Sequence, residues 1–352
     1  MGNIKLFRRS KRKNSRSKQS SVCTTNAQNV AHEGIKTIEV EKLVENSSGS
    51  SLRVCVVTWN MNGKKVSSQD LEKLVDGERN FDLLVIGLQE VPRCNMAQLL
   101  QEALSEGHSL LGESLMQSLQ LFVFGAKPYD HLIIKDIKID KYDVGGLGGL
   151  LGRKKGAVAI SITVRRIQML FISCHLSAHA HNVEERNSQL RDISHFLFSK
   201  NQNPYARPPD ITVWLGDLNY RIQGLENQPV RNLIQRDLHT ELLTSKDQLL
   251  QEAERGQIFE GYCEGSLEFK PTYKYDVGSS NYDTSNKVRI PSWTDRILFK
   301  TEKSSDLEAE LHAYDSIDHI DISDHKPVRA VLSLKLSKSD LPRDSENKFL
   351  YP

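Results

Sequence analysis

Two kinds of hydrophobic pattern run along the chain. Short apolar runs rich in β-branched and aromatic residues predict buried strands at 53–59, 83–88, 119–124, 131–135, 157–164, 168–174, 211–215, 295–299, 308–314 and 328–336. Apolar residues at helical spacing predict helices at 69–76, 95–118, 183–200, 229–236 and 240–255. Hairpins and longer crossovers are mixed, so we predict an α/β (α+β) fold in which two packed, mixed β-sheets are flanked by helices.

The flanks of this pattern are polar. We predict a disordered basic and Ser-rich tail over 1–51, a catalytic domain over 52–337 and a polar C-terminal tail over 338–352. Residues 1–32 hold eight Lys and Arg and no acid, whereas the remainder has 39 basic against 45 acidic residues. Such an arm suits an anionic membrane surface, where each cation contributes ~1 kcal/mol. A nuclear-import or RNA-binding arm is the competing interpretation.

Targeting and redox features are sparse. The N-terminus has no apolar core of a secretory signal, and no apolar run reaches the roughly 18 residues of a membrane span. The five cysteines lie far apart without a CxxC pair, so we expect neither a disulfide framework nor a zinc site. We therefore expect a cytoplasmic protein, peripheral to the plasma membrane or endomembranes, and a nuclear pool is compatible with the basic tail.

Polar side chains gather where predicted strands end or in the loops beside them. They are Asn60, Glu90, His175, Asp217 with Asn219, Asp295, and Asp324 with His325. A single Asp or Asn at such a place is an ordinary turn residue, and a single His is more often a satisfied core group. The whole set offers hard oxygen ligands, imidazoles and amides, which suits Mg²⁺ and the hydrolysis of a phosphate ester.

Two longer stretches give this set a family resemblance. Trp214-Leu-Gly-Asp-Leu-Asn-Tyr-Arg221 and Arg289-Ile-Pro-Ser-Trp-Thr-Asp-Arg-Ile-Leu298 resemble the two signature motifs of the inositol polyphosphate 5-phosphatases. Four shorter motifs, at 58–63, 89–90, 173–176 and 323–327, extend the resemblance over roughly 52–337. It implies the endonuclease/exonuclease/phosphatase superfamily, whose fold is a four-layer α/β sandwich. The short chain is similar to the compact plant enzymes of this family.

The resemblance also implies roles for individual residues. Glu90 would be the main metal ligand, with Asn60 beside it. Asp217 would orient or deprotonate the attacking water, and Asn219 would steady it. His325, held by Asp295, would stabilise the scissile phosphate, with Asp324 near the metal and His175 donating to a phosphate oxygen.

Substrate choice would depend on a second group of residues. Tyr273, Lys274 and Lys287 match the family's group that grips the 4-phosphate of the inositol ring, and fixed cations suit a phosphate beside the scissile one. We also expect Arg289, Arg296 and Lys155 to contact substrate. The alternative for the 269–276 stretch is a solvated basic loop with aromatic packing.

The Gly-rich segment 144–156 carries apolar and basic residues together. Leu147, Leu150 and Leu151 are followed by Arg153 and Lys154, so we predict that this loop dips into a bilayer while its cations meet the headgroups. It resembles the membrane-facing loop of lipid-hydrolysing members. A flexible hairpin tip is the alternative.

We therefore predict a Mg²⁺-dependent phosphoric monoester hydrolase that removes the 5-phosphate of phosphoinositides. The expected substrate is phosphatidylinositol 4,5-bisphosphate, and the 3,4,5-trisphosphate is a further candidate. Alternatives are a 5-phosphatase of soluble inositol polyphosphates, a nuclease on the same scaffold, and an inactive phosphoinositide-binding module. We expect a monomer that meets the lipid headgroup at the membrane surface and binds no nucleic acid.

Overall fold

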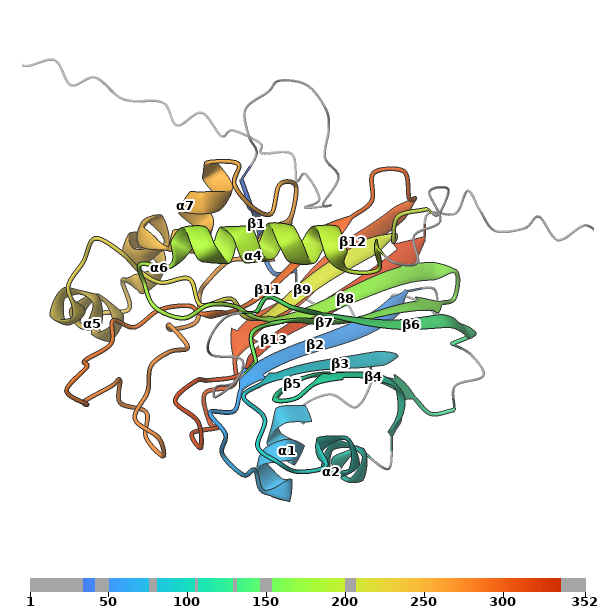
Figure 1. Ribbon diagram of the computed structural model, residues 1–352, viewed down its shortest axis with the longest axis horizontal. Helices are drawn as coiled ribbons and strands as arrows, with labels where there is room; N and C mark the ends of the chain where they lie inside the picture. The colour runs from blue at the N-terminus through green and yellow to red at the C-terminus, as the bar shows by residue number, and fades with distance from the viewer. Residues whose placement is uncertain are drawn as a thin grey trace, which may run out of the picture.

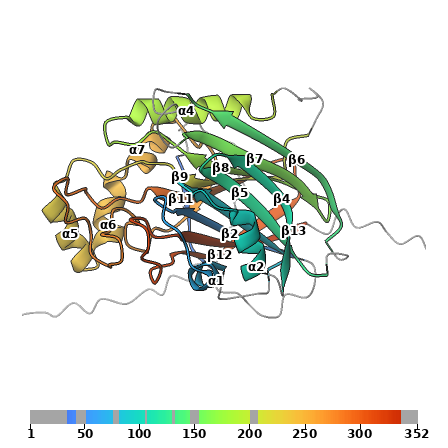
Figure 2. The same ribbon diagram turned by 60° about the horizontal axis from the view of Figure 1, so that its bottom comes forward.

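Two β-sheets stacked face to face form the body of the protein. The computed structural model describes residues 34–41, 51–75, 81–104, 107–128, 132–145, 154–199 and 207–336. Helices cover the outer face of each sheet, which gives four layers (Figures 1 and 2). The predicted four-layer sandwich of mixed sheets is thus confirmed. In the described ranges, no helix is both long enough and apolar enough to cross a membrane.

The first sheet has the strand order β1-β10-β11-β9-β8-β7-β6. Its strands, in chain order, are β1 Lys36–Ile38, β6 Ile134–Asp143, β7 Gly156–Val164, β8 Ile167–His175, β9 Ile211–Asp217, β10 Cys263–Gly265 and β11 Asp295–Thr301. The second sheet has the order β12-β13-β2-β3-β5-β4. Its strands are β2 Leu52–Asn60, β3 Leu83–Gln89, β4 His108–Met116, β5 Leu119–Ala126, β12 Leu307–Ser316 and β13 Val328–Leu336.

Each sheet contains one parallel pair at its centre. Strands β2 and β3 run parallel with Asn60 opposite Gln89, and β8 and β9 run parallel with His175 opposite Asp217. At the carboxyl end of each parallel pair the chain leaves the sheet and enters a loop. Side chains from neighbouring strand ends can therefore come together there.

The helices of the described residues lie around the two sheets. They are α1 Ser68–Val75, α2 Met96–Ala103, α4 Val183–Phe196, α5 Asn227–Gln235, α6 His239–Leu243, the 3₁₀ turn η3 Thr244–Lys246, and α7 Gln248–Glu254. Helices α1 and α2 bury Leu71 and Leu100 against the second sheet. Helices α4 and α7 bury Ile193 and Leu249 against the first.

The main core lies between the sheets, which approach each other closely beneath the parallel strands. Gly87 of β3 faces β8 and β9 there, and a Cβ at this position would lie 2.7 Å from both Leu215 Cδ1 and Ser173 Oγ. A larger side chain at this position would have to displace the side-chain ends of Leu215 and Ser173 in the opposite sheet.

The helix predicted over 95–118 and the disordered tail predicted over 1–51 both differ from the structure. The sequence predicts one helix over 95–118, but α2 ends at Ala103 and residues 108–116 form β4, paired antiparallel with β5. Leu110, Leu111 and Leu115 are helically spaced, yet Gly107 and Gly112 weaken a helix and the hairpin satisfies the backbone instead. Strand β1 lies inside the segment predicted as a disordered tail, because it pairs parallel with β10.

The thiols also differ in part from expectation. Cys94 and Cys174 are free thiols, whereas Cys263 is disulfide-bonded. The absence of a short-range cysteine pair in the sequence carries no information about a bond between distant residues, so the expectation of no disulfide is wrong for Cys263.

Candidate active site

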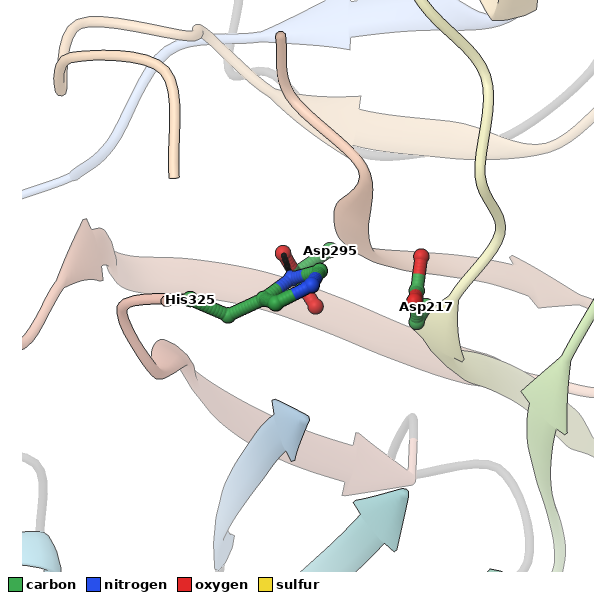
Figure 3. Close-up of side chains that lie close together, drawn as sticks. All are labelled: Asp217, Asp295 and His325. Atoms are coloured by element: carbon green, nitrogen blue, oxygen red, sulfur yellow. Dashed lines mark hydrogen bonds and ion pairs between the residues drawn. The ribbon is translucent and has the colours of Figure 1, made fainter. Parts of the chain in front are cut away.

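Polar side chains from both sheets meet at one end of the sandwich. Asn60 ends β2, Glu90 follows β3, and His175 and Asp217 end β8 and β9. Asp295 begins β11 directly opposite Asp217. His325 and Asp324 come from the loop before β13. Figure 3 shows His325 beside Asp295 and Asp217. The structure therefore gathers the strand-end residues that the sequence singles out.

Asp217 is 2% exposed and is held from several sides. Asn60 Nδ2 donates to its Oδ2 at 2.9 Å, and the backbone N–H of Asn219 donates to its Oδ1 at 3.1 Å. Burial opposes ionisation of this carboxyl group, but its contact with His175 and the charges of His325 and Lys155 outweigh burial and hold the pKa of Asp217 well below its usual range. Asp217 is thus a buried carboxylate at neutral pH.

Asn219 lies in the left-handed region at φ 58°, which turns the chain sharply after β9. Its side-chain amide donates to the carbonyl oxygen of Leu176 at 3.1 Å, and its Oδ1 accepts a hydrogen bond from Arg221. The turn therefore joins the segments that follow β8 and β9.

His325 forms a buried ion pair with Asp295. Its Nδ1 lies 2.9 Å from Asp295 Oδ2, and Thr272 and Thr294 each donate to that same oxygen at 2.8 Å. Burial alone would lower the pKa of His325, but the Asp295 carboxylate, helped by Asp217 and Asp324, raises this pKa to about 9. The imidazole is therefore cationic at neutral pH.

Asp324 is half-buried, and its backbone oxygen accepts a hydrogen bond from Tyr275 N at 2.9 Å.

Thr272 and Thr294 are partners of Asp295 that sequence reasoning misses. Their only signal is a hydroxyl residue near a carboxylate, which is common in any turn.

His175 is 1% exposed and lies between two carboxylates. Its Nε2 is 3.5 Å from Asp217 Oδ2 and 3.7 Å from Glu90 Oε1, and Lys155 Nζ hydrogen bonds to the same nitrogen. Burial, together with the charge of Lys155, lowers the pKa of His175 to about 4. An ammonium group can only donate, so Nε2 is the acceptor and the proton of this neutral ring resides on Nδ1.

The residues present fit a hard divalent cation. Glu90 presents a carboxylate whose side chain is 16% exposed, beside Asp217 and the amide of Asn60. Oxygen donors of this kind suit Mg²⁺, which needs only one or two carboxylates. Asp217, Asp295 and His325 also offer ligand atoms within 4.8 Å of one another (Figure 3). Since the nearest Asp295 oxygen already receives three donors, we favour Glu90 and Asn60 over Asp295 as ligands.

A cavity of about 320 Å³ opens beside the catalytic cluster. Of the predicted substrate residues, Tyr273, Lys287 and Arg289 line it. The ring centroids of Tyr273 and His325 are 4.5 Å apart, so this aromatic ring separates the cavity from the imidazole. Among the described residues that line it there is no carboxylate, which makes the cavity suited to an anion.

Arg221 is a site residue to which the sequence analysis gives no role. Its guanidinium carbon lies 4.3 Å from the centre of the Tyr273 ring, and its Nε donates to Asn219 O at 3.2 Å. It lines the cavity together with His179. Its place in the first long motif, four residues after Asp217, is the signal that could have identified it.

Three further predicted substrate contacts are placed differently from one another. Lys155 lies in the site against His175. Lys274 follows Tyr273 but is not among the described residues that line the cavity, and its Nζ is 3.7 Å from Asp283 Oδ1. Arg296 is fully buried, and the prediction that it contacts substrate is wrong.

Arg296 instead forms an internal ion-pair network. Its Nη1 is 2.9 Å from Asp247 Oδ1, and its Nη2 and Nε donate to Glu264 at 2.5 and 2.6 Å. Neighbouring side chains on a strand leave opposite faces, so Arg296 points away from the face on which Asp295 meets His325.

The predicted membrane loop lies largely outside the described residues. Leu147, Leu150, Leu151 and Arg153 are not described. Lys154 is described and forms an ion pair with Asp143 at the end of β6.

Comparison with known proteins agrees with this geometry. Residues 57–331 match the family described as Endonuclease/Exonuclease/phosphatase family 2. The chain is 58% identical over 305 residues to a protein of Arabidopsis thaliana named type IV inositol polyphosphate 5-phosphatase 11, covering 87% of this chain and 89% of that one. It is 34% identical over 329 residues to phosphatidylinositol 4,5-bisphosphate 5-phosphatase A of Homo sapiens, covering 84% of this chain but only 32% of that longer one.

A solved structure is similar as well. It is the inositol polyphosphate 5-phosphatase domain of SPsynaptojanin in complex with inositol (1,4)-bisphosphate and a calcium ion. The TM-score is 0.69 at 28% identity, and the match covers 81% of this chain and 86% of that one.

Proposed function

Since the chain belongs to the inositol polyphosphate 5-phosphatases of the endonuclease/exonuclease/phosphatase family, we propose that it removes the 5-phosphate of phosphatidylinositol 4,5-bisphosphate with the help of Mg²⁺. The 3,4,5-trisphosphate is a further candidate substrate. The name of the human relative supports the lipid. The inositol (1,4)-bisphosphate held by the SPsynaptojanin domain favours a second candidate, the soluble inositol polyphosphates.

One observation carries the proposed reaction. A buried ionised Asp217 and a buried cationic His325 lie in one cluster, next to a cavity lined by cations. A phosphate ester needs a base for the attacking water and positive charge around the phosphoryl oxygens. The site offers both.

Individual residues of the chain have separate roles in the proposed reaction. A bound Mg²⁺, held by Glu90 and Asn60, would neutralise charge on the phosphoryl group. Asp217 accepts a proton from the attacking water, and the hydrogen bond from Asn60 keeps its carboxylate oriented. His325 donates to a phosphoryl oxygen through Nε2, since its Nδ1 is bound to Asp295.

The remaining residues select and orient the substrate. Lys155 donates to the scissile phosphate, and the neutral His175, whose Nε2 accepts a hydrogen bond from Lys155, holds this ammonium group beside Asp217. Tyr273, Lys287 and Arg289 bind the 4-phosphate in the adjacent cavity. As the P–O bond to the ring breaks, the ring oxygen takes up a proton from solvent, and Asp217 returns to solvent the proton that it accepted from water. A free 5-hydroxyl and inorganic phosphate result.

We also propose that 52–337 is the catalytic domain of a monomer that works at the membrane surface in the cytoplasm. The basic segment 1–51 and the 144–156 loop would provide the contact with anionic lipid. The tail 338–352 has no proposed role.

The proposed activity is tested by measuring the release of inorganic phosphate. Vesicles containing phosphatidylinositol 4,5-bisphosphate and, separately, inositol 1,4,5-trisphosphate are incubated with the full chain and Mg²⁺. We expect release from both, faster from the lipid, and loss of about 10³-fold in Asp217→Ala, which lacks the base. A chelator should abolish release, and Mg²⁺ should restore it.

Two outcomes would count against the proposal. Wild-type protein that binds the vesicles but releases no phosphate would indicate a binding module. Nicking of plasmid DNA at a rate comparable to phosphate release would favour the nuclease alternative.

A further inference from the structure

Arg186 of α4 is a fully buried cation outside the proposed catalytic set. Its Nη1 donates to two backbone oxygens, those of Ser177 at 3.1 Å and His179 at 2.7 Å. Its guanidinium lies over the Tyr220 ring, 4.8 Å from the centroid. Among the described residues, no carboxylate forms an ion pair with Arg186. A buried charge without a counter-charge is costly, so its retention calls for a reason.

Gln248, the first residue of α7, completes the arrangement. Its Oε1 accepts hydrogen bonds from Arg186 Nη2 at 2.8 Å and from the backbone N–H of Arg221 at 3.0 Å. Its Nε2 donates to Ala180 O at 2.9 Å. The single carboxamide therefore connects the segment after β8 with the segment after β9.

These two segments are walls of the substrate cavity. Residues Ala178, His179 and Ala180 line one side, and Arg221 and Ile222 line another. The backbone of both walls is thus fixed from behind by the same buried pair. A loop that must hold its place before substrate arrives costs less binding energy when it is already ordered.

We infer that Arg186 is a positioning residue of the substrate cavity, which acts with Gln248 to fix both cavity walls and adds a positive charge behind the bound phosphates. The inference rests on the proposed function for the identity of the ligand as an inositol polyphosphate. It assigns no chemical step to Arg186, because its side chain points to backbone oxygens and has no exposed atom.

A purely structural role would leave a different trace. Arg186 could serve only to hold α4 against the sheet, in which case its loss would lower stability and leave affinity alone. Asn187, the next residue, provides the matched control. It is equally buried, and it contacts Glu252 of α7 at 2.8 Å and Tyr220 Oη at 2.7 Å, neither of which is among the described residues that line the cavity.

The test measures binding apart from turnover. Inositol 1,4,5-trisphosphate is titrated calorimetrically into the full chain with a chelator present, and kcat and KM are measured with Mg²⁺. Arg186→Met should raise Kd and KM about tenfold, the scale of a lost charged hydrogen-bonding group, with kcat within about threefold of wild type. Arg186→Lys keeps the charge but not the planar fork of donors, so it should fall between the two.

The control and the second variant keep the result decisive. Asn187→Leu should lower the melting temperature and leave Kd unchanged. If Arg186→Met does not fold, Gln248→Met removes the link between the walls without removing charge and should raise Kd about threefold. A wild-type Kd in both Arg186→Lys and Gln248→Met, or an equal rise in Asn187→Leu, would overturn the inference.

Failure of the proposed function would look different. In that case wild-type protein would release no phosphate, yet the order of Kd values among the variants would still follow the buried pair. Full turnover in wild type with no change in Kd among the variants would instead remove only this inference.

Discussion

The Nδ1 atom of His325 lies 2.9 Å from Oδ2 of Asp295. Thr272 and Thr294 donate to that same oxygen, so the carboxylate is held in place independently of the imidazole. The pair keeps His325 charged and directs its other nitrogen toward a substrate, a use of aspartate known from many hydrolytic sites.

The first prediction concerns pH. Since the pKa of His325 is raised to about 9, its deprotonation should reduce kcat as pH rises through about 9. The folded-state pKa exceeds the unfolded value near 6.5, so the ion pair stabilises the fold fully below about pH 6.5 and loses this contribution as pH rises through about 9. Measurements of kcat and of the melting temperature from pH 6 to 10 test both expectations. A flat kcat up to pH 10 would contradict the assignment.

Asp295→Asn should separate charge from shape. The amide is the same size but cannot stabilise the imidazolium, so the pKa of His325 should fall and the decline of kcat should move to lower pH. We expect kcat at pH 7 to drop about 10²-fold or more. Circular dichroism serves as the folding control, and a variant with more than a tenth of wild-type kcat at pH 7 would argue against a role for the pair.

Lys287 and Lys274 should differ in their effect on KM. Lys287 lines the cavity, whereas Lys274 is partly offset by Asp283. Lys287→Ala should raise KM for inositol 1,4,5-trisphosphate about tenfold, Lys274→Ala should raise it less, and the double variant most. Phosphatidylinositol 5-phosphate, which lacks the 4-phosphate, is the comparison substrate. An equal rise on that lipid would show that the lysines do not read the 4-phosphate.

The predicted membrane loop can be tested by changing its apolar residues together. Replacing Leu147, Leu150 and Leu151 with Ser should leave turnover of inositol 1,4,5-trisphosphate unchanged and reduce turnover on anionic vesicles about tenfold, because the loop would no longer insert. Vesicle co-sedimentation provides the independent measurement. Equal activity on both substrates would remove this loop from the membrane-binding surface.

Much of the site was within reach of the sequence because strand ends obey a simple rule. Asn60, His175 and Asp217 each follow an apolar run, and parallel pairing of the runs places their ends together. The rule gives no information on residues behind the site. Arg186 lies in the first turn of α4, where a charged residue normally faces solvent.

The errors have equally local causes. Arg296 shares a motif with Asp295, but alternation along β11 turns the two side chains to opposite faces. Leu110, Leu111 and Leu115 are compatible with a helix as well as with a strand. Pairing with β5 decides in favour of the strand, so the helix predicted over 95–118 ends early. Contacts between distant segments settle both cases, and a local pattern does not contain them.

The close approach at Gly87 has one more consequence. Asn60 and Glu90 belong to one sheet, whereas His175 and Asp217 belong to the other. The geometry of the site therefore depends on how the two sheets pack against each other. A methyl group at position 87 would displace Leu215 Cδ1 and Ser173 Oγ, which belong to the sheet that carries His175 and Asp217. Close packing at Gly87 therefore helps to set how the two halves of the site lie relative to each other.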